Sequence, residues 1–262
     1  MPKKANNYLQ KRRKTEKNMK CLILAAGYAT RLYPLTENFP KPLLVVGGRS
    51  ILDILIDDVE SCCLVDEYVV ISNHKFIDHF NEWAKSRFEH ITVIDDGTST
   101  NETRLGAVRD IQYAIDKLSI DDELLILAGD NLLDFSLTRF IEFAKAKGTS
   151  CVMRYTENDP KRLTKSGVLS IGEDDLVLEM WEKPHVPKSN QCCPPFYYLT
   201  REDAKLVAKA LSEGCSADAP GGFIEWLAFR SPLHAMAMPG RRYDIGNLES
   251  YEQVKRDYKP LG

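Results

Sequence analysis

The sequence has no apolar run near the roughly 18 residues that a membrane-spanning helix needs, so no membrane span is expected. It contains seven cysteines, an odd number, and none of them forms a C-x-x-C pair. This spacing suits neither a zinc site nor a disulfide framework. Reduced thiols in a cytoplasmic protein are the expectation.

Several motifs of common enzyme classes are also missing. The five histidines show no ligand spacing, which gives no support to a histidine metal centre. There is no G-x-S-x-G elbow of a serine hydrolase, and the first loop lacks the G-K-[ST] ending of a P-loop ATPase. A glycosyltransferase would usually show a D-x-D metal motif, which Asp130-Asn131-Leu132 does not supply.

The net charge differs in sign between the first 18 residues and the rest of the chain. Residues 1–18 carry about +6 and the remainder about −9, so the body is acidic and no nucleic-acid partner is expected. The basic tail lacks the apolar segment of a secretory signal and is predicted to be disordered. Three interpretations stay open: a dispensable tail, an extension upstream of a true start at Met19, or an electrostatic docking arm.

The most informative stretch is LILAAGYATRLYPLTENFPKPLL, Leu22 to Leu44. An apolar strand ends at Leu24, and the small residues Ala25, Ala26 and Gly27 follow it. Small residues allow backbone N–H groups to approach an anion closely. Arg31 and Lys41 add two cations, although most such residues are merely solvated. The stretch predicts a polyphosphate-binding loop.

Hydrophobic patterning predicts an α/β protein. Expected strands are 21–24, 68–71, 91–94, 123–128, 151–155, 167–171, 176–181 and 196–199, and expected helices are 50–63, 75–88, 105–118, 202–211, 223–229 and 247–257. The β-α-β rhythm of the first half predicts a Rossmann-like, mixed but mostly parallel sheet flanked by helices. We therefore expect a nucleotide-binding half at 19–148 and a smaller α+β half at 149–262 of the same domain.

Charged residues follow several of these strands. Asp130 and Asp244 each stand at a strand end, and two carboxylates with phosphate oxygens and water suit Mg²⁺, although each alone is commonly structural. Glu182-Lys183-Pro184 is either a surface ion pair or a site where Lys183 holds a second anionic substrate.

Together these motifs resemble the sugar nucleotidyltransferases, also called NDP-sugar pyrophosphorylases, which include glucose-1-phosphate thymidylyltransferases, uridylyltransferases and mannose-1-phosphate guanylyltransferases. The family pattern L-A-x-G-x-G-T-R-L-x-P-x-T followed by P-K-x-L is matched by 24–36 and 40–43. The likeness continues through Leu105-Gly106, Gly129-Asp130-Asn131, Gly167-Val168, Glu182-Lys183-Pro184, Phe196-Tyr197-Tyr198 and Tyr243-Asp244-Ile245-Gly246.

The resemblance implies a reaction of a nucleoside triphosphate with a sugar 1-phosphate, giving an NDP-sugar and pyrophosphate with Mg²⁺ as cofactor. It implies that Leu24, Ala25, Ala26 and Gly27 hold the nucleoside and phosphates, that Arg31 and Lys41 bind the triphosphate, and that Glu102 and Gly106 lie against the base. By the same likeness Asp130 and Asp244 hold the metal. Gly167, Glu182, Lys183 and Tyr197 are assigned to the sugar phosphate, and Arg31, Lys41, Asp130 and Lys183 to catalysis.

Three departures from the pattern matter. The loop before Leu105 lacks the Gln typical of thymidylyl enzymes, and Glu102 could instead pair with donors on another base. Ala29 replaces the second glycine, so the loop either needs no positive φ there or shifts. Pro194-Pro195 replaces a small pair before the family's tyrosine. The base, the sugar and any homo-oligomeric state stay open. So do a cytidylyltransferase of phosphocholine or another non-sugar phosphate, and a non-catalytic sugar-nucleotide-binding subunit.

Overall fold

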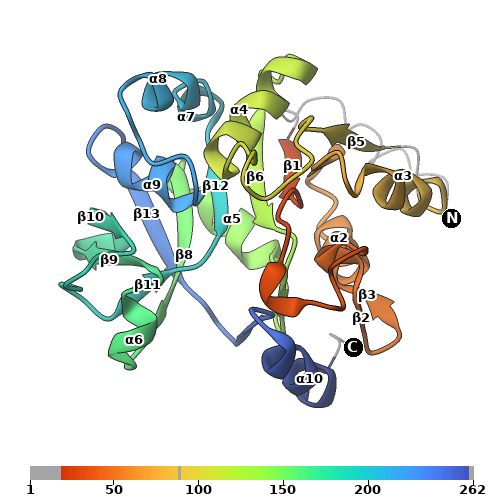
Figure 1. Ribbon diagram of the computed structural model, residues 1–262. Helices are drawn as coiled ribbons and strands as arrows, with labels where there is room; N and C mark the ends of the chain where they lie inside the picture. The colour runs from red at the N-terminus through yellow and green to blue at the C-terminus, as the bar shows by residue number, and fades with distance from the viewer. Residues whose placement is uncertain (1–18, 88–89, 260–262) are drawn as a thin grey trace, which may run out of the picture.

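A computed structural model describes residues 19–87 and 90–259, and the predicted basic tail 1–18 lies outside them. Its main feature is a ten-stranded sheet in the order β10-β9-β11-β8-β12-β6-β1-β4-β5, with β13 paired to β8 (Figure 1). In Figure 1, β9, β10 and β11 lie at the left of the molecule and β5 with α3 at the right. One sheet therefore runs through both predicted halves, while the boundary at 148/149 stays a prediction.

The first half supplies the parallel core of the sheet. Its strands are β1 (Met19–Leu24), β4 (Glu67–Ser72), β5 (Ile91–Asp95) and β6 (Glu123–Ala128). All pair in parallel, and Leu22 stands between Val69 and Ile126 in register. The four strands predicted from apolar runs in this half are confirmed.

The second half extends the same sheet with a change of direction. Its strands are β8 (Ser150–Thr156), β9 (Gly167–Ile171), β10 (Val177–Glu182), β11 (Gln191–Cys193), β12 (Phe196–Leu199) and β13 (Leu233–Ala237). β12 runs antiparallel to both β6 and β8, whereas β13 pairs with β8 in parallel. The predicted α/β class with a mixed, mostly parallel central sheet is confirmed, although β11 and β13 were not predicted.

Helices cover both faces of the sheet. They are α2 (Ile51–Ser61), α3 (Ile77–Lys85), α4 (Ala107–Leu118), α5 (Thr138–Lys147), α6 (Pro160–Leu163), α7 (Arg201–Ala204), α8 (Val207–Ser212), α9 (Gly221–Ala228) and α10 (Leu248–Asp257). Helix α5 was not predicted. Within the described ranges no helix combines the length and apolar character that a membrane crossing requires.

The predicted helix at 202–211 is wrong in one respect, because it is two helices. The N–H of Leu206 donates to the carbonyl of Asp203, which makes a tight turn between α7 and α8. The buried side chain of Asp203 is held by the hydroxyls of Ser150 and Ser231, so that α7 is anchored to β8 and cannot continue straight. A periodicity argument does not detect such a long-range anchor.

Alternation along β1 divides the core between the two faces. Cys21 and Ile23 belong to one buried cluster, which includes residues of α2, α5 and α10. Leu22 belongs to the other, which includes residues of α4, α8 and α9. Because both faces are buried, the parallel strands read as continuous apolar runs in the sequence.

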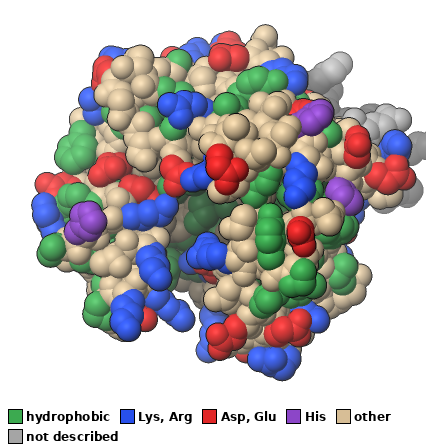
Figure 2. All heavy atoms as spheres, viewed as in Figure 1, with side chains coloured by type: hydrophobic (Ala, Val, Ile, Leu, Met, Phe, Trp, Pro, Cys, Tyr) green, Lys and Arg blue, Asp and Glu red, His purple; other side chains and the backbone are tan. Residues whose placement is uncertain are grey.

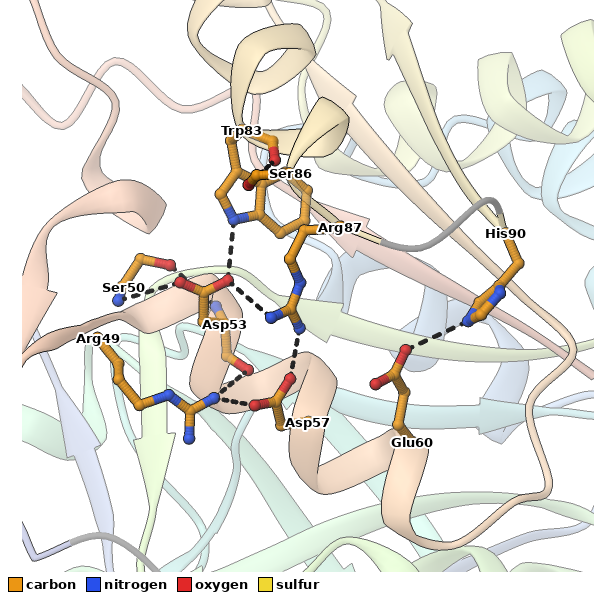
Figure 3. Close-up of polar contacts among 9 residues, drawn as sticks. All are labelled: Arg49, Ser50, Asp53, Asp57, Glu60, Trp83, Ser86, Arg87 and His90. Atoms are coloured by element: carbon orange, nitrogen blue, oxygen red, sulfur yellow. Dashed lines mark hydrogen bonds and ion pairs between the residues drawn. The ribbon is translucent and has the colours of Figure 1, made fainter.

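A polar network fixes the start of α2 against α3 (Figure 3). Ser50 is the N-cap of α2 and forms a reciprocal capping box with Asp53. Asp53 also accepts from Trp83 Nε1 at 3.0 Å and pairs with Arg87 at 3.4 Å, and Arg87 reaches Asp57 as well. Burial raises the pKa of Asp53, but these partners outweigh burial and the net pKa is lowered. The network orients α2, which contacts the segment carrying Lys41.

Candidate active site

A cleft of about 410 Å³ lies between the two halves of the chain. Figure 2 shows the corresponding hollow at the centre of this face, with hydrophobic side chains on its floor and Lys and Arg side chains around it. Its lining includes most of the residues that the sequence had singled out: Leu24, Ala26, Gly27, Arg31, Gly106, Asp130, Gly167, Glu182, Lys183, Tyr197 and Asp244. Ala25, Lys41 and Glu102 do not line it.

The loop after β1 is held in shape by its neighbours. Asn73, after β4, donates from Nδ2 to the carbonyl of Ala26 at 2.9 Å. Gly27 is exposed, and a Cβ added there would meet no atom within 4 Å. No protein contact therefore requires glycine at position 27, and the open space faces the cleft.

Ala29 does adopt the left-handed conformation, with φ 48° and ψ 40°. Of the two alternatives for Ala29, the one in which the loop needs no positive φ at this position is therefore wrong. Its carbonyl accepts from the N–H of Leu32 at 2.9 Å and from the hydroxyl of Thr36, which is fully buried, at 2.8 Å. These contacts stabilise a conformation that costs a non-glycine residue about 1–2 kcal/mol.

The two cations predicted for the triphosphate occupy different places. Arg31 is exposed on the cleft wall, on the short 3₁₀ turn Thr30–Leu32. Lys41 is buried, and its Nζ lies 2.7 Å from Oδ2 of Asp130. Burial raises the pKa of Asp130, yet the charge and hydrogen bond of Lys41, with Arg242, lower it overall. Asp130 is therefore held ionised at the cleft.

The two predicted metal ligands are brought close by a short two-stranded sheet. Strand β7 (Asn131–Leu133) begins directly after Asp130, and β14 (Arg242–Asp244) pairs with it so that Asp244 stands opposite Asn131. In the part of the chain that the structure describes, no group of three or more His, Cys, Asp or Glu is arranged to hold a metal. Two carboxylates are nevertheless the kind of partial ligand set with which Mg²⁺ retains water and phosphate oxygens.

Glu182 lies at the other end of the cleft, between two glycines. A Cβ on Gly221 would lie 2.0 Å from its Oε2, and a Cβ on Gly167 would lie 3.0 Å from the same atom. Gly167 thus makes room for the carboxylate. Burial raises the pKa of Glu182 to about 7, Lys183 opposes the rise, and Glu225 and Asp218 add to it.

Lys183 follows Glu182 in a strained backbone conformation. Its φ is 50°, and its N–H donates to the carbonyl of Ser166 at 3.2 Å. Two further cations, Lys165 and Arg242, line the same cleft. Strained backbone maintained by surrounding contacts is frequent at ligand-binding positions.

The loop before α4 does not present the predicted Glu102 to the cleft. Glu102 is exposed, and the loop side chain that lines the cleft is Arg104, whose Nη2 lies 2.8 Å from Oδ1 of Asp218. The N–H groups of Ala107 and Val108 donate to the carbonyls of Asp218 and Ala217. These two donors at the start of α4 therefore hold the loop before α9.

Glycine is required at position 106 because the loop before α9 packs closely on the start of α4. The φ of Gly106 is 90°, and a Cβ would lie 2.6 Å from the carbonyl oxygen of Ala217.

Tyr197 is buried on β12 opposite Val152 and Ile126. Nearby, the carbonyl of Pro195 accepts from the N–H of Ala128, which ties the Pro194-Pro195 wall to β6.

The sequence analysis missed five charged residues that line the cleft: Arg104, Asp110, Lys165, Asp218 and Arg242. Arg242 had a usable signal, because it stands two residues before the predicted ligand Asp244. Its Nη1 donates to Asn131 Oδ1 at 2.6 Å. Nothing in the local sequence distinguishes the other four from surface charges.

Comparison with known proteins shows the family. A family model described as "Nucleotidyl transferase" matches residues 20–260. The chain belongs to this nucleotidyl transferase family. It is 31% identical over 194 residues to the "Bifunctional protein GlmU" of Methanocaldococcus jannaschii, covering 73% of this chain and 42% of that protein. The match to a glucose-1-phosphate adenylyltransferase of Clostridium novyi is 24% over 257 residues, covering 92% of this chain and 67% of that protein.

Solved structures of the family share the fold. A UDP-glucose pyrophosphorylase complexed with UDP-glucose superposes with a TM-score of 0.76 at 18% identity, covering 92% of this chain and 98% of that one. The chain spans less than half the length of the GlmU relative. The family model thus shows the family of the chain, and the solved structure shows the fold that carries the cleft.

Proposed function

We propose that this chain is a sugar-1-phosphate nucleotidyltransferase, which transfers the nucleoside monophosphate of an NTP to a sugar 1-phosphate and releases pyrophosphate. One observation supports it most strongly: a single cleft is lined by Arg31 and Asp130 from the first half and by Lys165 and Lys183 from the second. Two anionic substrates entering from opposite sides would meet in that cleft. Family membership supports the same reaction class.

The chemistry asks little of a protein base. The second pKa of a phosphate monoester is about 6, so the attacking sugar phosphate is already largely ionised at neutral pH. The protein has to orient this oxygen in line with the α-phosphorus and stabilise the charge of the leaving pyrophosphate. In the proposal, Arg31 contacts the triphosphate, and Lys183 aligns the attacking phosphate.

The carboxylates suit a divalent cation. Asp130 is kept ionised beside Lys41, and Asp244 is half exposed at the cleft, so both offer oxygen donors to Mg²⁺. When bound, the cation would neutralise phosphate charge. Lys41 is a positioning residue in this account, because its ammonium group fixes the orientation of Asp130.

Glu182 is suited to the sugar rather than to phosphate. Its buried carboxyl group, with a pKa raised by burial to about 7, exchanges readily between hydrogen-bond donor and acceptor forms. Sugar hydroxyls accept and donate equally well, so we assign them to Glu182. We include a cytoplasmic location in the proposal, supported by the seven unpaired cysteines, which all lie in the described part of the chain.

The test is pyrophosphate release over a panel of substrates. Each common triphosphate is combined with glucose 1-phosphate, mannose 1-phosphate, other sugar 1-phosphates and phosphocholine, with and without Mg²⁺. We expect release that needs one triphosphate and one sugar 1-phosphate together. Release that occurs with a triphosphate and phosphocholine, but with no sugar 1-phosphate, would favour the cytidylyltransferase alternative. Tight sugar-nucleotide binding without turnover would favour the non-catalytic subunit.

A further inference from the structure

Asp110, on the first turn of α4, is a buried acid whose Oδ1 has no hydrogen-bond partner among the described residues. It is 6% exposed, and its Oδ1 is inaccessible to solvent and accepts no hydrogen bond from any described residue. Buried carboxylates are nearly always hydrogen-bonded or ion-paired, because an unsatisfied charged group is costly. An exception at a cleft calls for a missing partner.

The side chain of Asp110 belongs to the cleft lining, four residues after Gly106 on the same helical face. The start of its own helix does not supply the missing donors, since the N–H groups of Ala107 and Val108 are used by the loop before α9. Arg104, the cation of the adjoining loop, is committed to Asp218. The donor therefore comes from outside the described residues, either from water or from a ligand bound in the cleft.

Charge narrows the kind of ligand. Asp96, another buried carboxylate, is near enough to raise the pKa of Asp110 further, after burial, to about 7. A phosphate group next to these two acids would be repelled. The ligand group is instead a neutral hydrogen-bond donor.

The surroundings fit the nucleobase. Small or apolar residues also line the cleft, among them Leu24, Ala26, Ala107 and Ala128, and such residues can pack against a flat ring. Of the two substrates in the proposed reaction, the triphosphate is the one that carries such a ring. The exposed Glu102 is poorly placed for this task.

Resting on the proposed function, we infer that Asp110 is the specificity-determining residue for the base and accepts a hydrogen bond from a base amino group. Guanine, adenine and cytosine carry an exocyclic amino group. Uracil and thymine present only a ring N–H between two carbonyl oxygens, and these oxygens are repelled by ionised Asp110, the form that prevails above its pKa of about 7. The substrate class is therefore an amino-bearing NTP: GTP, ATP or CTP rather than UTP or dTTP.

The experiment measures kcat/KM for these triphosphates at a fixed saturating sugar 1-phosphate, for the wild type, Asp110→Asn and the control Asp116→Asn, an exposed position on the same helix. The wild type should prefer an amino-bearing base. Asp110→Asn should lower that preference over UTP and dTTP by at least about tenfold with an unchanged KM for the sugar 1-phosphate, and Asp116→Asn should match the wild type.

Two results would overturn the role of Asp110 while leaving the proposed function intact: a wild type that prefers UTP or dTTP, or an Asp110→Asn variant that slows all triphosphates equally. If no triphosphate reacts, the proposed function fails, and calorimetric competition between nucleoside diphosphates on the wild type still tests the base preference. The same competition applies if Asp110→Asn does not fold.

Discussion

The ammonium group of Lys41 lies 2.7 Å from the carboxylate of Asp130, although 89 residues separate them in the chain. The Lys41 side chain is 9% exposed and that of Asp130 is 37% exposed, so the cation is covered and the anion reaches the cleft. Such a pair orients a carboxylate before any ligand arrives. Lys41 lies in the segment after β1 and Asp130 in the loop after β6, and these two strands are parallel neighbours in the sheet.

Asp130→Ala is expected to abolish Mg²⁺-dependent turnover. The change removes an oxygen donor for the cation and leaves the Lys41 ammonium group buried without its anion, at a cost of about 3–5 kcal/mol. Pyrophosphate release and thermal melting are measured together, with Asp116→Ala as the exposed control. Turnover close to that of the wild type at any Mg²⁺ concentration would refute the assignment of Asp130.

Lys183→Ala should weaken the use of the sugar 1-phosphate more than the use of the triphosphate. Loss of a charge-assisted contact to phosphate is expected to raise the KM for the sugar 1-phosphate by about tenfold or more. Lys188→Ala is the matched control, because Lys188 is 65% exposed and lies only five residues further along the chain. An equal change in both KM values would argue against a role specific to the acceptor.

Gly27→Ala should affect triphosphate binding, whereas Gly106→Ala should affect the stability of the fold. The added methyl group at Gly27 meets no protein atom, so stability should change by less than about 0.5 kcal/mol while the KM for the triphosphate rises. The methyl group at Gly106 meets a carbonyl at 2.6 Å with φ at 90°, so the free energy of unfolding should fall by about 2 kcal/mol or more. Denaturant titration and triphosphate kinetics on both variants decide this.

Ala29→Gly should not destabilise the protein, unlike glycine at most alanine positions. Relief of the left-handed conformation offsets the higher entropy of the unfolded chain, so the expected change is a gain of about 0–1 kcal/mol. Ala84→Gly, in the last turn of α3, is the control and should lose about 0.5 kcal/mol. A loss at position 29 as large as the loss at position 84 would contradict the described loop conformation.

Asp110→Asn should stabilise the fold in a pH-dependent way. Burial raises the pKa of Asp110 from 3.8 to about 7, so the folded state binds the proton more tightly than the unfolded state. The free energy of unfolding of the wild type therefore falls as pH rises from about 4 to about 7. The variant lacks this loss, so its free energy of unfolding should exceed that of the wild type by up to about 4 kcal/mol near pH 8. The difference should shrink toward pH 4.

Denaturant unfolding at several pH values checks this, with Asp116→Asn as the control that should show no pH-dependent difference. A constant difference between Asp110→Asn and the wild type across the whole range would show that the carboxyl group titrates normally. A destabilising acid retained at a cleft is the behaviour expected of a functional residue.

Local patterns made parts of this structure predictable. The apolar runs of β1, β4 and β6 are readable because strands buried on both faces need no polar positions. Ser50 was readable as the start of a helix because Ser is a favoured N-cap residue. The loop after β1 could be predicted as a phosphate site because small residues and cations occur together within one short stretch, and that role stays a prediction.

What escaped prediction depends on contacts distant in sequence. The pairing of β13 with β8, and the break between α7 and α8 at Asp203, are set by partners far along the chain. Asp110 was readable as a helix residue, but its lack of a donor follows from how the loop before α9 uses the start of α4. Glu102 was assigned to the base from the family resemblance, and the loop sequence alone does not tell an exposed acid from a buried one.

The most direct test of the account is a ³¹P NMR record of one reaction containing the enzyme, Mg²⁺, the preferred triphosphate and a sugar 1-phosphate. The account predicts that pyrophosphate and an NDP-sugar diphosphate ester appear in equal amounts, and only when both substrates are present. Pyrophosphate formed without the sugar 1-phosphate, or no new phosphorus signal with any substrate pair, would contradict it.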